Sequence, residues 1–129
     1  MSQEDLELAK RGYAAFRDGD MATVRDTFHE DISWVMPGKN RLSGTYEGQE
    51  EVFGLIAQVV QATGGTLHQE IHDMLESDDH VVVLLKVSAS SGDKSAESHQ
   101  VHVLHTEDGK LKSMWIMSDD QDAWDAFYG

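Results

Sequence analysis

The sequence of 129 residues contains no cysteine, one proline and no long apolar run. The absence of thiols excludes disulfide bonds, cysteine-ligated metal sites and a cysteine nucleophile. No apolar stretch approaches the ~20 residues that a helix needs to span a bilayer, and the acidic N-terminus lacks the apolar core of a secretory signal. We therefore expect a cytoplasmic protein of one domain, residues 1–129, with no membrane partner.

Basic residues are scarce as well. Ten lysines and arginines stand against 24 aspartates and glutamates, which gives a net charge of −14 at pH 7. Proteins bind nucleic acids and anionic membranes largely through lysine and arginine contacts to phosphates, so the charge argues against both as partners. A solvated acidic surface is the simplest interpretation of this composition.

The hydrophobic pattern predicts helices and one strand in the first half of the chain, then a run of strands. The expected elements are a helix from Leu6 ended by Asp18-Gly19, a short helix capped by Asp20 and carrying Phe28, a strand at residues 32–36, a loop at 38–47, a helix from Gln49 ending before Gly64, strands at about 66–76, 81–90, 96–105 and 111–117, and a final short helix opened by Asp119 or Asp120. Segregated helices and strands indicate an α+β fold, with the helices on one face of a curved antiparallel sheet.

The pair Asp108-Gly109 predicts a type I′ hairpin turn, because both central residues of that turn need positive φ. A two-residue turn places Glu107 opposite Lys110 and His102 opposite Trp115, and alternation then divides the side chains into two sets. The first set comprises His99, Val101, Val103, Met114, Ile116 and Ser118, and the second comprises Gln100, His102, Leu104, Trp115 and Met117. A bulge at Ser98 or Ser113 would exchange part of these two sets.

The run Val-Val-Val-Leu-Leu at residues 81–85 is apolar on both faces of its expected strand. One face must meet the helices, and the other needs a cover of its own. We therefore expect a homodimer.

Several short motifs resemble those of the nuclear transport factor 2-like superfamily, and within it the SnoaL-like and ketosteroid-isomerase-like branch. They are Tyr-Ala-Ala-Phe-Arg-Asp-Gly-Asp at residues 13–20, Thr27 to Asp31 before a strand, Met36-Pro37-Gly38, Gly44 and Gly48 ahead of a helix, and the ending from Asp108 through Trp115 to Asp119. The resemblance covers essentially the whole chain. It implies a cone-shaped fold with an apolar pocket between the first helix, the third helix and the concave sheet face, but it does not specify a reaction.

The resemblance also implies where catalytic groups would lie. A ketosteroid isomerase carries a tyrosine on the first helix, a carboxylate base at the end of the first strand and a protonated aspartate on a later strand. Tyr13 matches the tyrosine, but the base position holds Met36 and the aspartate position falls near Val101. A thioether and an alkyl group cannot exchange protons, so the chain is not an orthodox ketosteroid isomerase.

By the same resemblance the first set of side chains lines the pocket, and the second set, with His102, Trp115 and Met117, lies at the homodimer interface. The residues expected to bind a ligand are Phe16, Trp34, Met36, Val52, Leu55, Val101, Met114 and Ile116. A small hydrophobic molecule is the expected ligand.

Tyr13, His99 and Asp119 are the candidate catalytic residues. Tyr13 could donate a hydrogen bond to a carbonyl oxygen, or it could be a core tyrosine with its hydroxyl in solvent. His99 on the pocket wall could move a proton, since histidine titrates near neutral pH, or it could simply hydrogen-bond a neighbour at the strand end. Asp119 could act as an acid or base, or it could cap the last helix.

Seven histidines suggest a metal site, but their spacing along the strands argues against one. His99, His102 and His105 are three residues apart, so consecutive members point to opposite faces of a strand. His68 and His72 share a face, yet their Cβ atoms would lie roughly 13 Å apart. The sequence also lacks a phosphate loop and a dinucleotide fingerprint, and we predict no metal site and no cofactor.

Three functions remain open. The first is a cofactor-independent isomerase, cyclase or dehydratase acting on a small hydrophobic carbonyl compound. The second is a non-catalytic dimeric module that binds a small apolar ligand. The third is a dimer that serves protein interaction alone, as the nuclear transport factors do.

Overall fold

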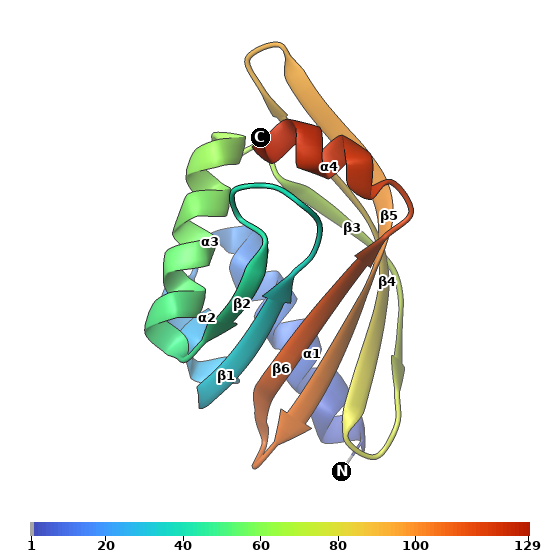
Figure 1. Ribbon diagram of the computed structural model, residues 1–129. Coiled ribbons are helices and arrows are strands. Elements are labelled where there is room, and N and C mark those ends of the chain that lie inside the picture. The colour runs from blue at the N-terminus through green and yellow to red at the C-terminus, as the bar shows by residue number, and fades with distance from the viewer. Residues whose placement is uncertain (1) are drawn as a thin grey trace.

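A strongly curved sheet wraps around helices in the computed structural model, which describes residues 2–129 (Figure 1). The helices are α1 (Ser2–Asp18), α2 (Met21–Thr27), α3 (Gln49–Thr63) and α4 (Gln121–Tyr128). The strands are β1 (Phe28–Met36), β2 (Gly44–Glu47), β3 (His68–Glu76), β4 (His80–Ser91), β5 (Lys94–Glu107) and β6 (Lys110–Ser118). The predicted α+β cone is confirmed. Among residues 2–129, no helix is long and apolar enough to cross a membrane.

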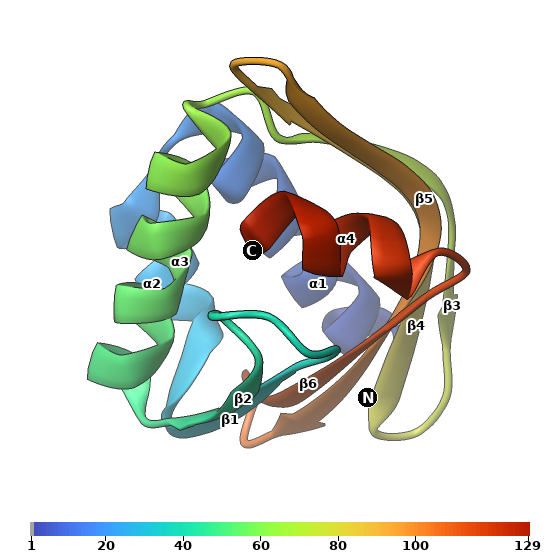
Figure 2. The same cartoon turned by 45° about the horizontal axis from the view of Figure 1, so that its top comes forward.

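The strands of residues 2–129 form one sheet of six in the order β2-β1-β6-β5-β4-β3. Strands β3 to β6 make the predicted antiparallel meander, whereas β1 runs parallel to β6. α1 and α3 lie on the concave side, and α4 lies across one end of the space that they and the sheet surround (Figure 2). The sheet is therefore mixed, and its concave face is enclosed by helices.

Two differences from the predicted elements lie in the first half of the chain. β1 begins at Phe28, which the pattern assigns to the short helix before it. Residues 44–47, predicted as loop, form the edge strand β2, in which Thr45 pairs with Val35. β2 is short and mostly exposed, so its sequence carries no hydrophobic alternation that could reveal it.

Local signals fixed the ends of several helices. The Asp20 side chain accepts a hydrogen bond from Thr23 N at the start of α2, and Gly64 ends α3 in the left-handed conformation with φ 58°. Asp120 caps α4 by accepting from Ala123 N. Of the two aspartates considered for that cap, Asp120 is the one used, so Asp119 is not the helix cap.

The hairpin between β5 and β6 has the predicted turn. Asp108 and Gly109 have φ values of 54° and 73°, and Glu107 pairs with Lys110. Beyond the turn, however, Thr106 pairs with Leu111 and His105 pairs with Ser113, so Lys112 is an extra residue in β6. Of the two bulge positions that the sequence analysis considered, Ser98 and Ser113, the second is directly adjacent to the observed bulge at Lys112.

The bulge at Lys112 makes part of the predicted register wrong. His102 pairs with Ile116 rather than with Trp115, because each residue of β5 beyond the bulge faces a β6 residue one position further on. The concave face therefore carries Gln100, His102, Leu104, Met114 and Ile116, and the convex face carries His99, Val101, Val103, Trp115 and Met117. His102 consequently does not lie on the outer face proposed for a homodimer.

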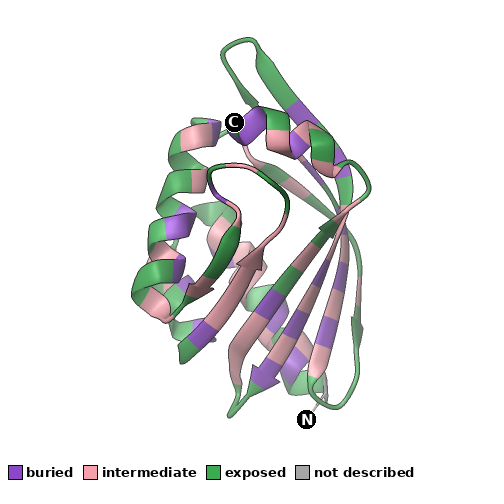
Figure 3. Cartoon of the chain, in the orientation of Figure 1, coloured by how far each residue is buried: buried purple, intermediate pink, exposed green. Residues whose placement is uncertain are grey.

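The core lies between the helices and the concave face. Buried residues alternate with less buried ones along β4 and β5 (Figure 3). Val81 and Val83 are fully buried with Leu55 of α3, while Val52 and Ile32 belong to a second cluster beside α2 and β1. These two clusters pack α1 and α3 against the sheet. A cavity remains between the two helices and the concave sheet face.

Candidate functional site

A cavity of about 150 Å³ lies between α1, α3, α4 and the concave face of the sheet. Its wall is mainly apolar, and it includes most of the residues predicted to bind a ligand: Phe16, Trp34, Met36, Leu55, Met114 and Ile116. Two predicted residues lie elsewhere. Val52 is buried in the second core cluster, and Val101 is on the convex face because of the bulge in β6.

A tyrosine and a histidine are joined on the cavity wall. Tyr13 comes from the middle of α1 and His102 from β5, and Tyr13 Oη lies 2.6 Å from His102 Nδ1. The two rings stack at a centroid distance of 5.9 Å. The other ring nitrogen, His102 Nε2, lies 2.8 Å from Gln100 Oε1.

These contacts assign the tautomer of His102. The Gln100 oxygen can only accept, so His102 Nε2 carries the proton and donates it. His102 Nδ1 is then unprotonated and accepts the hydrogen bond of the Tyr13 hydroxyl. The result is a directed chain of hydrogen bonds from Tyr13 through His102 to Gln100.

Burial keeps both rings uncharged. His102 is 2% exposed, and burial lowers its pKa to about 3, since the imidazolium would lose its hydration. Burial likewise raises the pKa of the Tyr13 hydroxyl far above its ordinary value. At neutral pH the pair is therefore a neutral phenol bonded to a neutral imidazole.

The other two predicted catalytic residues lie together outside this cavity wall. His99 Nδ1 is 3.1 Å from Asp119 Oδ2, and His99 N donates to Asp119 Oδ1 at 2.9 Å. Their side chains are 76% and 59% exposed. The structure thus pairs His99, inside β5, with Asp119, directly after the end of β6. Neither residue lies on the cavity wall with Tyr13, and their catalytic roles stay predictions.

One end of the cavity is closed by the loop after β1. Asp125 of α4 accepts hydrogen bonds from Lys39 N, Asn40 Nδ2 and Gln121 Nε2 at 2.8 to 3.0 Å, and these bonds lower the pKa of its carboxyl group. Gly38 has φ 94°, and a Cβ there would collide with Asp125 and Gln121. The positive φ at position 38 favours glycine, and any larger residue would also displace the ends of the Asp125 and Gln121 side chains.

A wide groove of about 990 Å³ runs between α1, α3 and β3. Five residues line both the groove and the cavity: Tyr13, Phe16, Ile56, Leu67 and Gln69. These side chains form the wall that the groove and the cavity share.

Sequence reasoning missed His102 and Gln100 as cavity residues. Both were assigned to the outer face by a hairpin register without a bulge. The segment Leu111-Lys112-Ser113 contains no glycine or other residue that marks a bulge. The buried position of His102 was therefore not readable from the local sequence.

Comparison with known proteins extends the similarity over nearly the whole chain. The profile of the SnoaL-like domain family matches residues 9–114. Bal32a, from a soil-derived mobile gene cassette, is 32% identical with a TM-score of 0.95 over 99% of this chain and 98% of its own. TerC, co-crystallised with polyporic acid, is 28% identical with a TM-score of 0.84 over 98% of this chain and 99% of its own. An uncharacterized protein of Mycobacterium tuberculosis is 26% identical over 125 residues, which are 96% of this chain and 95% of that protein.

Proposed function

The chain belongs to the SnoaL-like domain family, and we propose that it is a cofactor-independent acid–base enzyme acting on a small hydrophobic carbonyl compound. The observation that carries the proposal is the 2.6 Å hydrogen bond between Tyr13 and His102 on a mainly apolar cavity wall. Proton-transfer groups held in an apolar cavity suit isomerisation, cyclisation or dehydration beside a carbonyl group. The fold alone favours none of these reactions over the others.

In the proposed reaction Tyr13 takes a proton from the carbon next to the substrate carbonyl. The C–H bond breaks and its electron pair moves onto the carbonyl oxygen. The proton binds Tyr13 Oη while the original hydroxyl proton passes to His102 Nδ1, which already accepts its hydrogen bond. The negative charge on the substrate stabilises the imidazolium, which offsets the effect of burial on the pKa of His102. Return of the proton to a different carbon completes an isomerisation.

The size of the cavity limits the substrate. An apolar cavity of about 150 Å³ accommodates a molecule the size of one benzene ring, and the cavity of this chain has about that volume. A ligand with more than one ring would not fit within this volume. A ligand of that size would have to extend into the groove between α1 and α3. We therefore propose a substrate with one ring in the cavity.

Deuterium exchange tests the proposed reaction without knowledge of the natural substrate. We expect the chain to accelerate exchange next to the carbonyl of cyclohex-2-enone in D₂O, followed by NMR. Tyr13→Phe and His102→Gln should each slow this exchange by ~10²–10⁴-fold, the usual contribution of a positioned acid or base. His72→Ala, at an exposed histidine of β3, is the control and should keep the rate of the unmodified chain.

The pH profile separates this mechanism from the one predicted from the sequence. Because burial lowers the pKa of His102 to about 3 and raises that of Tyr13, the pair stays neutral and kcat/KM should be flat from about pH 5 to 9. Proton transfer by an exposed histidine would instead give an inflection near the ordinary histidine pKa of about 6.5. An inflection that disappears in His99→Ala would transfer the catalytic role to His99.

A non-catalytic binding module is the second candidate. The observation that favours it is Met36 on the cavity wall, where related isomerases carry a carboxylate base. Saturable binding of cyclohex-2-enone with no exchange above the buffer rate would support this function and contradict the first.

We also propose that a second copy covers the convex face. Trp115 and Met117 are 50% and 51% exposed there, beside the partly buried Val103 of β5. An apolar surface of this kind is typical of a protein interface. Sedimentation velocity should show a dimer, and Trp115→Lys should give a monomer with an unchanged far-UV spectrum.

A further inference from the structure

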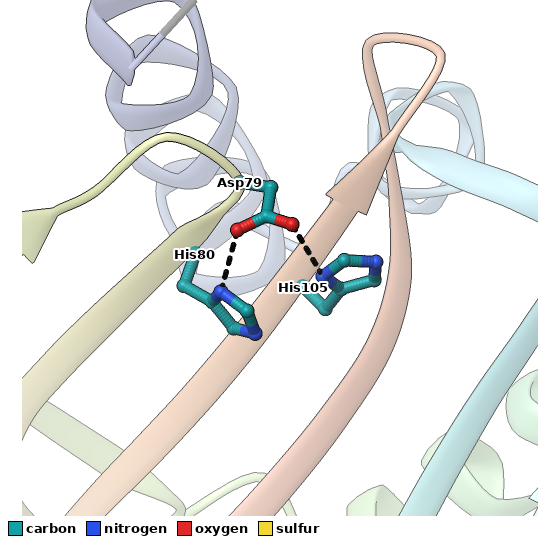
Figure 4. Close-up of side chains that lie close together, drawn as sticks. All are labelled: Asp79, His80 and His105. Atoms are coloured by element: carbon teal, nitrogen blue, oxygen red, sulfur yellow. Dashed lines mark hydrogen bonds and ion pairs between the residues drawn. The ribbon is translucent and has the colours of Figure 1, made fainter.

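Asp79, His80 and His105 converge at one end of the convex sheet face (Figure 4). Asp79 lies in the turn before β4, His80 is the first residue of β4, and His105 is its direct partner on β5. His80 Nδ1 is 2.8 Å from Asp79 Oδ1, and His105 Nδ1 is 3.8 Å from Asp79 Oδ2. The two imidazole rings lie 4.9 Å apart between centroids.

Backbone hydrogen bonds hold the three residues in place. Thr106 N donates to Asp79 O, and Ser77 N donates to His80 O, each at 2.9 Å. The first bond ties the turn to β5, next to His105. The three side chains therefore share a framework that is already ordered, and binding an ion would require only side-chain rotation.

His105 has a ring nitrogen that the protein leaves unsatisfied. Its Nδ1 is buried and has no hydrogen-bond partner among residues 2–129. The nearest carboxylate oxygen, at 3.8 Å, is too distant for a hydrogen bond. The side chains of His80 and His105 as a whole are 39% and 34% exposed, so the cluster lies at the surface of the protein.

We propose that Asp79, His80 and His105 form a binding site for a divalent transition-metal ion such as Zn²⁺. Their donor atoms all lie within 4.8 Å of one another. Two imidazole nitrogens and one carboxylate oxygen are a common ligand set for zinc, cobalt, nickel and iron. Mg²⁺ and Ca²⁺ prefer oxygen ligands and fit this set poorly. Water would complete the coordination.

The sequence contained the signal for this site. The two-residue turn at Gly92-Asp93 pairs Ser91 with Lys94 and, by continuation, His80 with His105. The prediction of no metal site considered only the spacing of histidines along a single strand. Such spacing does not detect ligands that face each other across two strands.

A second cluster on the molecule is a weaker candidate. His29, Glu107 and Asp108 also have donor atoms within 4.8 Å, but they supply one imidazole, and His29 Nε2 lies 3.9 Å from a largely exposed Asp108 carboxylate. Borderline metal ions bind imidazole more tightly than carboxylate. The site with two histidines should therefore fill first.

Titration of the tag-free chain with Zn²⁺ and Co²⁺ tests the proposal. We expect one ion per chain by calorimetry, visible Co²⁺ absorption, and no heat with Mg²⁺. His80→Gln and His105→Gln should each weaken Zn²⁺ binding by at least ~10–100-fold. Loss of a residue that only hydrogen-bonds a metal ligand already has an effect of this size, and loss of the ligand itself should have at least the same effect. His99→Ala is the matched control, because His99 also contacts a carboxylate but faces no second imidazole.

NMR of the histidine rings provides a readout that does not depend on the variants. On addition of Zn²⁺ to the unmodified chain, the ring signals of His80 and His105 should shift and those of His99 should not. The proposal is overturned if the chain binds no Zn²⁺, if both glutamine variants bind it like the unmodified chain, or if the shifts fall on His29 instead. None of these results depends on catalysis in the cavity.

Discussion

His102 and His105 lie three residues apart on β5 and have opposite surroundings. His102 is 2% exposed, faces the cavity and accepts a hydrogen bond from Tyr13. The His105 side chain is 34% exposed, faces outward and lies near the carboxylate of Asp79. The same residue type thus serves as a neutral hydrogen-bond acceptor on one face and as a candidate metal ligand on the other.

The comparison shows that the face of the sheet, rather than the residue type, decides the chemistry of each histidine. An odd spacing places the two on opposite faces whatever the register. The bulge at Lys112 then decides which residues of β6 share those faces, since it places Ile116 beside His102 and Trp115 on the convex side. One extra residue therefore sets the composition of both surfaces.

Insertion of one alanine after Lys112 should break this arrangement and have the largest effect. With a single bulged residue kept, the inserted alanine would pair with His105 and Trp115 would lie opposite His102, because a one-residue slip moves every later side chain of β6 to the other face. Trp115 would enter the cavity and Met114 would leave it. We expect loss of more than ~4 kcal/mol of stability, measured by urea unfolding.

Lys112→Ala provides the control for that insertion. It keeps the bulge and removes a long contact of 3.4 Å from Lys112 Nζ to Asp31 O. Exposed substitutions of this kind change stability by less than ~0.5 kcal/mol. An insertion variant that unfolds like Lys112→Ala would show that the hairpin takes up the added residue in a larger bulge and keeps its register.

Much of the fold was predictable because its signals are local. Asp20, Gly64 and the Asp108-Gly109 turn each act through their own backbone conformation or through bonds to residues a few positions away. β2 was missed because an exposed edge strand needs no hydrophobic alternation. A bulge was considered at Ser98 or Ser113, but its position at Lys112 was not predicted, because it satisfies packing on both sheet faces, which no short window of sequence describes.

The site was less predictable than the fold. The family resemblance placed Tyr13 on the cavity side of the first helix, and Tyr13 does line the cavity. The prediction placed His99 on the cavity wall and His102 on the outer face, and the structure has the reverse. Both assignments depended on the strand register, which the bulge at Lys112 shifts by one residue. An error of one residue in a strand thus leaves the fold prediction intact and reverses the prediction of the site.

The pH dependence of stability should sharpen the comparison at His102. Its pKa falls from 6.5 to about 3 on folding, so below pH 6.5 the unfolded chain binds a proton that the folded chain excludes. The contribution of His102 is therefore complete above pH 6.5 and decreases by up to ~1.4 kcal/mol per pH unit as the pH falls toward 3. Urea unfolding between pH 7 and 4 measures this slope.

His102→Gln isolates that contribution, because the variant shares every other titratable group. Its unfolding free energy should decrease less steeply below about pH 6.5 than that of the unmodified chain. Parallel curves would mean that His102 is protonated as easily in the folded chain as in the unfolded one, which contradicts its buried, neutral role.

His99→Ala should give the smallest effect and complete the comparison along β5. His99 shares the convex side with His105 but is 76% exposed and contacts a carboxylate that is itself mostly exposed. Such surface pairs contribute about 0–1 kcal/mol, and Asp119 keeps its bond to the backbone N–H of residue 99 in the variant. Unfolding in urea should therefore shift by less than ~1 kcal/mol. A loss of several kcal/mol would show that exposure alone does not rank the histidines of this strand, and that the tie between β5 and β6 depends on the imidazole of His99.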